Sequence, residues 1–179
     1  ENQSYLRVEG FTIENYLTRA DGQAGFGVFV SHSHHVVVAR NRVRHVGAAG
    51  IWFIRCRYRS AYVAGDEDVV IEDNDVADTN AQPDALGVRY QEAIDLVGVD
   101  NFVVRGNHVG ATYKEGITVK NGSGWGRVVG NRVDRGVGDL SRVGIYVDSY
   151  CGPPLDDVSP CAQQIVIDGN TVDGRVVGI

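Results

Sequence analysis

Apolar and polar residues alternate in short segments along the whole chain, and two such patterns recur. In the first pattern, asparagine stands three positions after a β-branched apolar residue and two positions before another. Alternation with a period of two is typical of a β-strand that buries one face. The pattern occurs six times, with phenylalanine in place of asparagine in the first copy: Val8, Phe11 and Ile13; Val38, Asn41 and Val43; Ile71, Asn74 and Val76; Val104, Asn107 and Val109; Val128, Asn131 and Val133; Ile167, Asn170 and Val172.

The second pattern falls between successive copies of the first and consists of a small residue, an apolar one, a variable one and another apolar one. It begins at Gly27, Gly50, Ala93, Gly116 and Gly144, and again at Gly178. Two short strands per unit cannot bury a face alone, so the units must stack around a shared interior. We therefore predict an all-β fold, a parallel β-helix of about six coils. An antiparallel sandwich is the competing fold, but it would need tight hairpin turns, and one Asn-Gly pair is present.

Two consequences of this fold concern the interior. The apolar residues that open the first pattern should form one buried stack along the axis: Val38, Ile71, Val104, Val128 and Ile167. The recurring asparagine lies at a sharp bend, where its amide can bond to backbone groups and to the asparagine of the next coil. We interpret this asparagine as structural and assign it no function.

Composition and charge narrow the class of protein. Valine and isoleucine carry most of the apolar content, which favours strands over helices. The composition does not change along residues 1–179 in a way that would separate two domains, so we expect one domain. A formal charge of −6 argues against binding to nucleic acid. No apolar segment is long enough to span a membrane. The lack of methionine and of visible end caps suggests a fragment of a longer chain.

Two of the three cysteines flank a loop rich in proline and aspartate, residues 152–160. We predict a disulfide between Cys151 and Cys161, which indicates a secreted or otherwise extracytoplasmic protein. The alternative is a pair of reduced, partly exposed thiols. Cys56 is then left unpaired.

Two stretches carry a family resemblance. Residues 114–123 read Lys-Glu-Gly-Ile-Thr-Val-Lys-Asn-Gly-Ser, and residues 142–148 read Arg-Val-Gly-Ile-Tyr-Val-Asp. With the two repeated patterns, they resemble secreted bacterial proteins of the right-handed parallel β-helix (pectate-lyase-like) superfamily, the fold of pectate lyases, polygalacturonases, alginate lyases, mannuronan epimerases and phage tailspikes. The resemblance covers nearly the whole chain and implies a right-handed helix. The shared residues belong to the scaffold, so the fold is implied more specifically than the activity.

Stacking turns the second pattern into a surface, because equivalent residues of adjacent coils lie one strand apart. The expected outward column is Phe29, Trp52, Asp95, Thr118 and Tyr146, and a parallel column contains Ser31, Ile54, Val97, Lys120 and Asp148. Outward positions of the first pattern, such as Val37 and Val70, are apolar and show no concentration of acids and bases. Exposed aromatic rings beside charged groups are typical of a sugar-binding groove.

The sequence therefore predicts a protein that acts on a polysaccharide, one that contains uronic acid, as a lyase or C5-epimerase. Such chemistry needs a base and a cation or arginine that neutralises the sugar carboxylate. We expect Lys120 to be the base and Arg142 to aid the carboxylate. The remaining catalytic candidates, which are also the candidate calcium ligands, are Asp95, Glu115 and Asp148. The candidate substrate-binding residues are Trp52, Tyr146, Glu92, Arg89 and Lys114.

Several alternatives stay open. The chain could be a noncatalytic glycan-binding or structural module, like adhesins and tailspikes, or a glycoside hydrolase of the polygalacturonase type. Lys120 and Asp148 could form a mere surface salt bridge. Glu92 and Glu115 are stacked like charges, which need a cation or a neighbouring basic residue between them, from Arg89, Lys114 and Arg142.

Two further segments contain residue types that occur in binding or metal sites. Residues 55–62 form a basic, aromatic stretch next to Trp52 that could guide an anionic polysaccharide or simply be solvated. The long loop to which this stretch belongs, residues 55–67, could instead cover Phe29 and Trp52. His32, His34 and His35 lack a carboxylate or cysteine at ligand spacing, so we assign them no metal.

Overall fold

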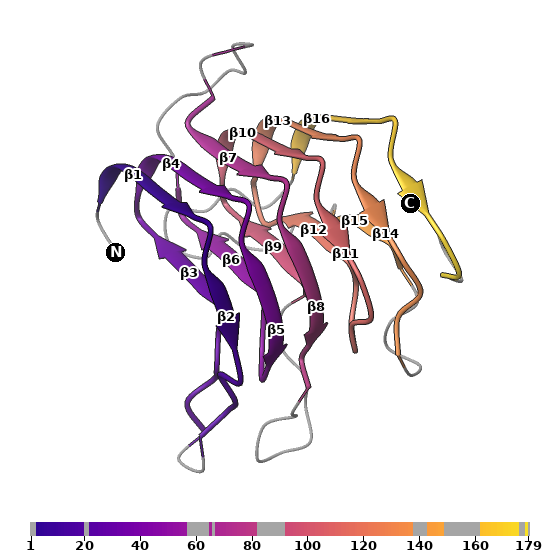
Figure 1. Ribbon diagram of the computed structural model, residues 1–179. Coiled ribbons are helices and arrows are strands. Elements are labelled where there is room, and N and C mark those ends of the chain that lie inside the picture. Colours follow the sequence, from indigo (N-terminus) through magenta and orange to yellow (C-terminus); the bar gives the residue numbers. More distant parts are fainter. Residues whose placement is uncertain are drawn as a thin grey trace.

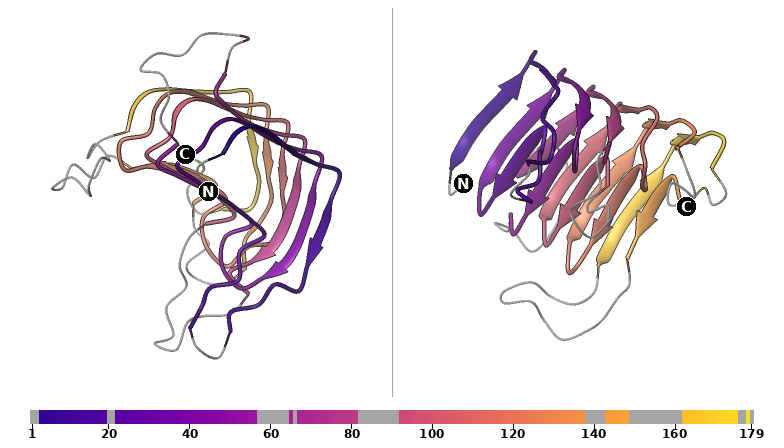
Figure 2. Two further views of the ribbon diagram at one scale, coloured as in Figure 1. Left: turned by 90° about the vertical axis from the view of Figure 1, so that its left-hand side faces the viewer. Right: turned by 90° about the horizontal axis from the view of Figure 1, so that it is seen from below.

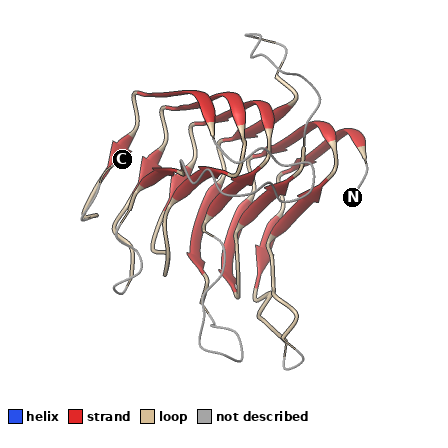
Figure 3. Ribbon diagram, turned by 180° about the vertical axis from the view of Figure 1, so that it is seen from behind, coloured by secondary structure: helices blue, strands red, loops and turns tan. Residues whose placement is uncertain are grey.

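The computed structural model describes residues 3–19, 22–56, 65, 67–81, 92–137, 143–148, 162–175 and 178. All regular elements in these ranges are β-strands, as Figure 3 shows from behind the molecule. Among the described residues no helix is long and apolar enough to cross a membrane.

The strands form three parallel sheets that run along the molecule (Figure 1). The first sheet contains β1 (Ser4–Glu9), β4 (His34–Ala39), β7 (Val69–Glu72), β10 (Asp100–Arg105), β13 (Gly124–Val129) and β16 (Gln163–Asp168). The second sheet contains β2 (Thr12–Glu14), β5 (Arg42–Val46), β8 (Asp75–Thr79), β11 (His108–Val109), β14 (Arg132–Val133) and β17 (Thr171–Val172). The third sheet contains β3 (Val28–Ser31), β6 (Ile51–Ile54), β9 (Ile94–Val97), β12 (Ile117–Lys120) and β15 (Ile145–Val147).

The chain visits the three sheets in turn, so each circuit adds one strand to every sheet and the two termini lie at opposite ends of the solenoid (Figures 1 and 2). The first sequence pattern covers the bend between the first and second sheets, and the second pattern forms the third sheet. This confirms the predicted parallel β-helix.

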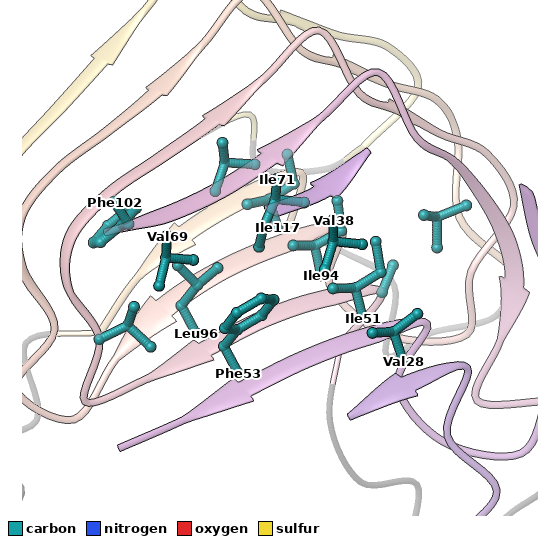
Figure 4. Packing of buried hydrophobic residues seen from close by; sticks show 14 of the residues in the cluster. Val28, Val38, Ile51, Phe53, Val69, Ile71, Ile94, Leu96, Phe102 and Ile117 are labelled. Carbon is teal, nitrogen blue, oxygen red and sulfur yellow. The ribbon is translucent and has the colours of Figure 1, made fainter. Parts of the chain in front are cut away.

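The interior is a set of apolar columns, and Figure 4 shows part of it from close by. The predicted stack is confirmed in its middle, where four members have no exposed surface: Val38, Ile71, Val104 and Val128. Ile167, on the last coil, is only partly buried because no strand follows it in the sheet. In a neighbouring column, a Cβ at Gly126 would collide with the ring of Phe102, so glycine leaves the space that this ring fills.

The recurring asparagines form a continuous ladder through the bend between the first and second sheets, as predicted. The Oδ1 atom of Asn107, for example, accepts hydrogen bonds from the backbone N–H and the Nδ2 group of Asn74, at 3.0 and 2.9 Å. The Nδ2 group of Asn107 donates to Asn131 Oδ1 on the next coil and to the Ile71 carbonyl on the previous one. Every rung therefore satisfies buried groups on two coils, which fixes their register.

The cysteines are only partly described. Cys151 and Cys161 lie outside the described residues. Cys56 is a free thiol, as expected. It is buried beside the carbonyl groups of Ile54 and Val30, and burial raises the pKa of its thiol to about 11.

Candidate functional site

The outer face of the third sheet carries the residues that the sequence singled out. Strand alternation turns Ile94 and Leu96 into the core and Asp95 outward. The register places five residues in one column across the strands, as predicted: Phe29, Trp52, Asp95, Thr118 and Tyr146. The exposure of this column is uneven, because Phe29 and Tyr146 are 38% and 42% exposed, whereas Asp95 is 1% exposed. The expectation of an open face is therefore wrong at the centre of the column.

A compact group of charged side chains surrounds this buried centre. We call it the charged cluster: Glu92, Asp95, Lys114, Glu115 and Lys120. The ammonium group of Lys120 lies 2.7 Å from Glu92 Oε2 and 3.3 Å from Asp95 Oδ2. Lys114 Nζ lies 3.0 Å from Glu92 Oε1 and 3.8 Å from Glu115 Oε2. The stacked carboxylates Glu92 and Glu115 are thus bridged by Lys114, one of the residues expected to separate them.

The surroundings shift the pKa values of two neighbouring carboxyl groups of the cluster in opposite directions. Burial alone would raise the pKa of Glu92, but Lys120 and Lys114 hold it at about 2. Burial and the charge of Glu92 both raise the pKa of Asp95 well above its usual value. Of the two groups, Asp95 is therefore the one that takes up a proton more readily.

Lys120 is held in its charged form. Burial alone would lower the pKa of its ammonium group, but the neighbouring carboxyl groups of Asp95 and Glu92 raise it above the usual value. A general base must be unprotonated before it can accept a proton. This environment makes Lys120 a poor candidate for the base that the sequence suggested.

Three polar oxygen atoms of the site are buried without a hydrogen-bond partner among the described residues. They are Asp95 Oδ1, Thr118 Oγ1 and Glu115 Oε2, and they come from adjacent coils. Burial raises the pKa of Glu115. Buried polar atoms without partners are rare in native proteins and indicate a place where a polar ligand or water is bound.

Aromatic rings lie next to the charged cluster on the same face. We call Phe26, Phe29 and Trp52 the aromatic cluster. The ring centroids of Phe29 and Trp52 are 4.8 Å apart, and those of Phe26 and Trp52 are 4.9 Å apart. Trp52 is the register partner of Asp95, so the two clusters adjoin directly.

The remaining candidates are placed as follows. Asp148 follows β15 and donates its backbone N–H to the Val119 carbonyl, one coil beyond the charged cluster. Tyr146 ends the outward column, two strands beyond Asp95. Arg89, Arg142 and most of the basic loop, residues 57–62, lie outside the described residues.

The charged cluster does not suit calcium. Calcium requires several oxygen ligands around one point. The ammonium group of Lys120 already lies between the carboxyl groups of Glu92 and Asp95. Among the described residues, no group of histidine, cysteine, aspartate and glutamate side chains is arranged to hold a metal.

Two groups of interacting side chains were not predicted from the sequence, because their members come from different coils. A carboxylate does accompany the histidines, since His35 Nε2 lies 3.3 Å from Asp68 Oδ1. On the outer face of the second sheet, His108 lies 3.0 Å from Asp75 and 2.8 Å from Asp134.

The group around His108 corrects the prediction that the outward positions of the first pattern show no concentration of acids and bases. The charges begin directly after the asparagine bend, where the outward positions of successive coils are Arg42, Asp75, His108 and Arg132. They occupy the variable position between the asparagine and the last apolar residue, so comparing that position across the aligned copies would have revealed them.

The opposite pKa shifts of Glu92 and Asp95 predict different outcomes for two conservative variants. Asp95→Asn should change the free energy of unfolding at pH 7 little, because burial and Glu92 already disfavour the charged form of Asp95. Glu92→Gln should lower it by about 1–3 kcal/mol, because two largely buried ammonium groups lose their ionised partner. Urea unfolding of both variants measures this, and equal losses would contradict the opposite shifts.

The family of the chain can now be stated. The sequence profile described as a right-handed beta helix region matches residues 2–171. No curated protein and no solved structure matches the chain. The profile spans nearly all of the sequence, and its architecture is the one that the three parallel sheets form. The chain belongs to the family of right-handed β-helix proteins.

Proposed function

We propose that the outer face of the third sheet binds a polysaccharide that carries carboxylate groups. A sugar ring stacks on Phe29 and Trp52, and its carboxylate and hydroxyl groups turn toward the charged cluster. The observation that carries this proposal is the register of Trp52 and Asp95 as partners on adjacent strands, which places an apolar platform beside a polar centre. Sugars have an apolar ring face and a polar edge, so they require both surfaces side by side.

The two lysines of the cluster favour an acidic sugar over a neutral one. The ammonium groups of Lys114 and Lys120 lie 3.0 and 2.7 Å from the Glu92 carboxylate. Both lysine side chains are about one-fifth exposed, at 22% and 20%, so they remain within reach of a ligand. In a chain of net charge −6, this is a local site for an anion.

The proposal includes two expectations from the sequence. Polymers of uronic acid lie outside the cytoplasm, which agrees with a secreted protein and with a disulfide between Cys151 and Cys161. Arg89, Arg142 and Tyr146 are retained as further contacts along the same face.

Replacing the aromatic platform should weaken binding. We expect Trp52→Ala to reduce affinity for polygalacturonate or alginate oligosaccharides about fivefold to tenfold, because ring stacking contributes about 0.5–1.5 kcal/mol beyond its buried area. Titration calorimetry measures the change. Phe11→Ala is the matched control, since Phe11 is 58% exposed but belongs to the bend between the other two sheets. Equal affinity of the Trp52→Ala and wild-type proteins would contradict the proposed platform.

A second candidate function is turnover of the bound uronate by a lyase or C5-epimerase. It is favoured by Glu115, a carboxyl group with a raised pKa whose Oε2 atom has no hydrogen-bond partner among the described residues and lies 3.8 Å from the ammonium group of Lys114. In this scheme Glu115 removes the proton at C5, and Lys120 neutralises the sugar carboxylate in place of calcium. A lyase then breaks the C4–O bond as the C4–C5 double bond forms, whereas an epimerase returns a proton to the other face.

Two substitutions separate these roles. We expect Lys120→Arg to retain most of the turnover, because it keeps the positive charge, and Glu115→Gln to reduce it at least about a hundredfold, in the range for loss of a general base. Absorbance of the unsaturated product, with and without a calcium chelator, detects a lyase, and proton exchange at C5 detects an epimerase. Turnover that survives in Glu115→Gln but disappears in Lys120→Arg would return the base to Lys120. Absence of turnover in the wild-type protein would leave binding as the function.

A further inference from the structure

The innermost part of the charged cluster brings an amino group and a carboxyl group together where little water reaches. Lys120 Nζ lies 3.3 Å from Asp95 Oδ2 and 2.7 Å from Glu92 Oε2. The Asp95 side chain is 1% exposed and that of Glu92 is 6% exposed. The register partners of Asp95 on the two adjacent strands are Trp52 and the fully buried Thr118. Reacting groups that the fold holds this close have a very high effective concentration toward each other.

Burial opposes the charges of this group. In water, an ammonium group and a carboxylate resist condensation because both charges are hydrated, and burial removes much of that hydration. Burial acts against the charged forms of Lys120 and Glu92, although their mutual attraction keeps the pKa of each shifted toward the charged form. Asp95 Oδ1 has no hydrogen-bond partner among the described residues. An amide at Asp95 would have one oxygen atom fewer to satisfy than the carboxyl group has.

We propose that Lys120 and Asp95 form an isopeptide bond, an amide between their side chains, with Glu92 as the proton carrier, and that this bond joins β9 to β12 covalently. Glu92 first accepts a proton from Lys120, which converts a buried ion pair into two neutral groups. Lys120 Nζ then attacks Asp95 Cγ, and a C–N bond forms as one C–O bond of Asp95 breaks. The oxygen leaves as water with two protons from the lysine nitrogen, passed on through Glu92. In total, an ammonium group and a carboxylate give an amide and one water molecule, so no further reactant is needed.

The preference of Lys120 for its charged form makes this reaction slow but does not prevent it. A general base must be unprotonated in every turnover of an enzyme, whereas this bond has to form only once in each molecule. Lys114 also contacts Glu92, at 3.0 Å, but the pKa of Glu92 is about 2. An ionised carboxylate loses an oxygen much less readily than a carboxyl group that takes up a proton, as Asp95 does, because its pKa is raised. The cluster therefore favours Asp95 as the acceptor.

The bond would leave the aromatic cluster and Lys114 unchanged. It would convert Lys120 into a neutral amide, so Lys114 would be the ammonium group of the cluster that a sugar carboxylate still meets. The turnover scheme that uses Lys120 would then apply to unlinked molecules only. Formation of the bond is measured without any ligand, and its outcome is therefore independent of whether the protein binds a polysaccharide.

The mass of the intact wild-type protein tests the bond directly. After the folded protein has been kept at neutral pH, reduced and denatured, we expect its mass to be lower than the calculated mass by one water molecule. A proteolytic digest should contain a branched peptide, located by tandem mass spectrometry, that joins the segment of Asp95 to the segment of Lys120. Succinimide formation at an Asp-Gly pair, such as Asp168-Gly169, also removes one water molecule but gives no branched peptide.

Three variants complete the test. Lys120→Arg and Glu92→Gln remove the nucleophile and the proton carrier, so both should give no branched peptide. Lys114→Arg is the matched control, because it alters the other ammonium group beside Glu92 and should still give the branched peptide. Far-UV circular dichroism checks that each variant is folded, and the wild-type protein decides the question even if Glu92→Gln does not fold.

Two results would overturn the proposal. One is a wild-type protein that retains its full calculated mass, and the other is a loss of water that maps to any site other than Asp95 and Lys120. A branched peptide from folded Glu92→Gln, formed as completely as in the wild-type protein, would overturn the role of Glu92 as the proton carrier.

Discussion

The structure depends on the fixed parallel register between coils, and the asparagine ladder is the interaction that enforces it. Each coil alone has three short strands and too little apolar surface to fold. Backbone hydrogen bonds between strands bring the coils together, but a strand can slip along its neighbour. The ladder removes this freedom, because the amide of Asn74 or Asn107 satisfies buried groups at one register only. Side chains that are far apart in the sequence are thereby held in straight columns.

The candidate site is a product of these columns. Lys114 and Lys120 are 22 and 28 residues from Glu92 in the sequence, yet both contact its carboxylate. Such preorganisation is what binding of a charged sugar or transfer of a proton requires. The ion pairs around His108 on the second sheet arise from the same stacking, but they are between about a third and a half exposed. Pairs with that exposure contribute little to stability and need no function to explain them. The charged cluster differs because it is more deeply buried, with the Glu92 side chain only 6% exposed and that of Asp95 only 1%.

The sequence predicts the fold well because each repeat marks the same structural positions in successive coils. Six copies of one phrase identify the strands, the bend and the buried stack, and the structure confirms each of them. The alignment of the second pattern also placed Asp95 beside Trp52 correctly. Burial of Asp95 and the charged state of Lys120 were not predictable, because both depend on distances between coils that a pattern does not contain. Pairs such as His35 with Asp68 escaped for the same reason, since the two residues come from different segments of the chain.

The most direct test of this account is the free energy of unfolding of two ladder variants, measured in urea. Asn107→Ala removes a rung from the middle, where its hydrogen bonds to Asn74, Asn131 and Ile71 are buried. We expect a loss of about 2–5 kcal/mol, the sum for two or three buried groups without partners. Asn170→Ala removes the last rung, where water reaches the bend, and we expect a loss of about 1 kcal/mol. Small and equal losses in the two variants would contradict the claim that the ladder fixes the register of the coils.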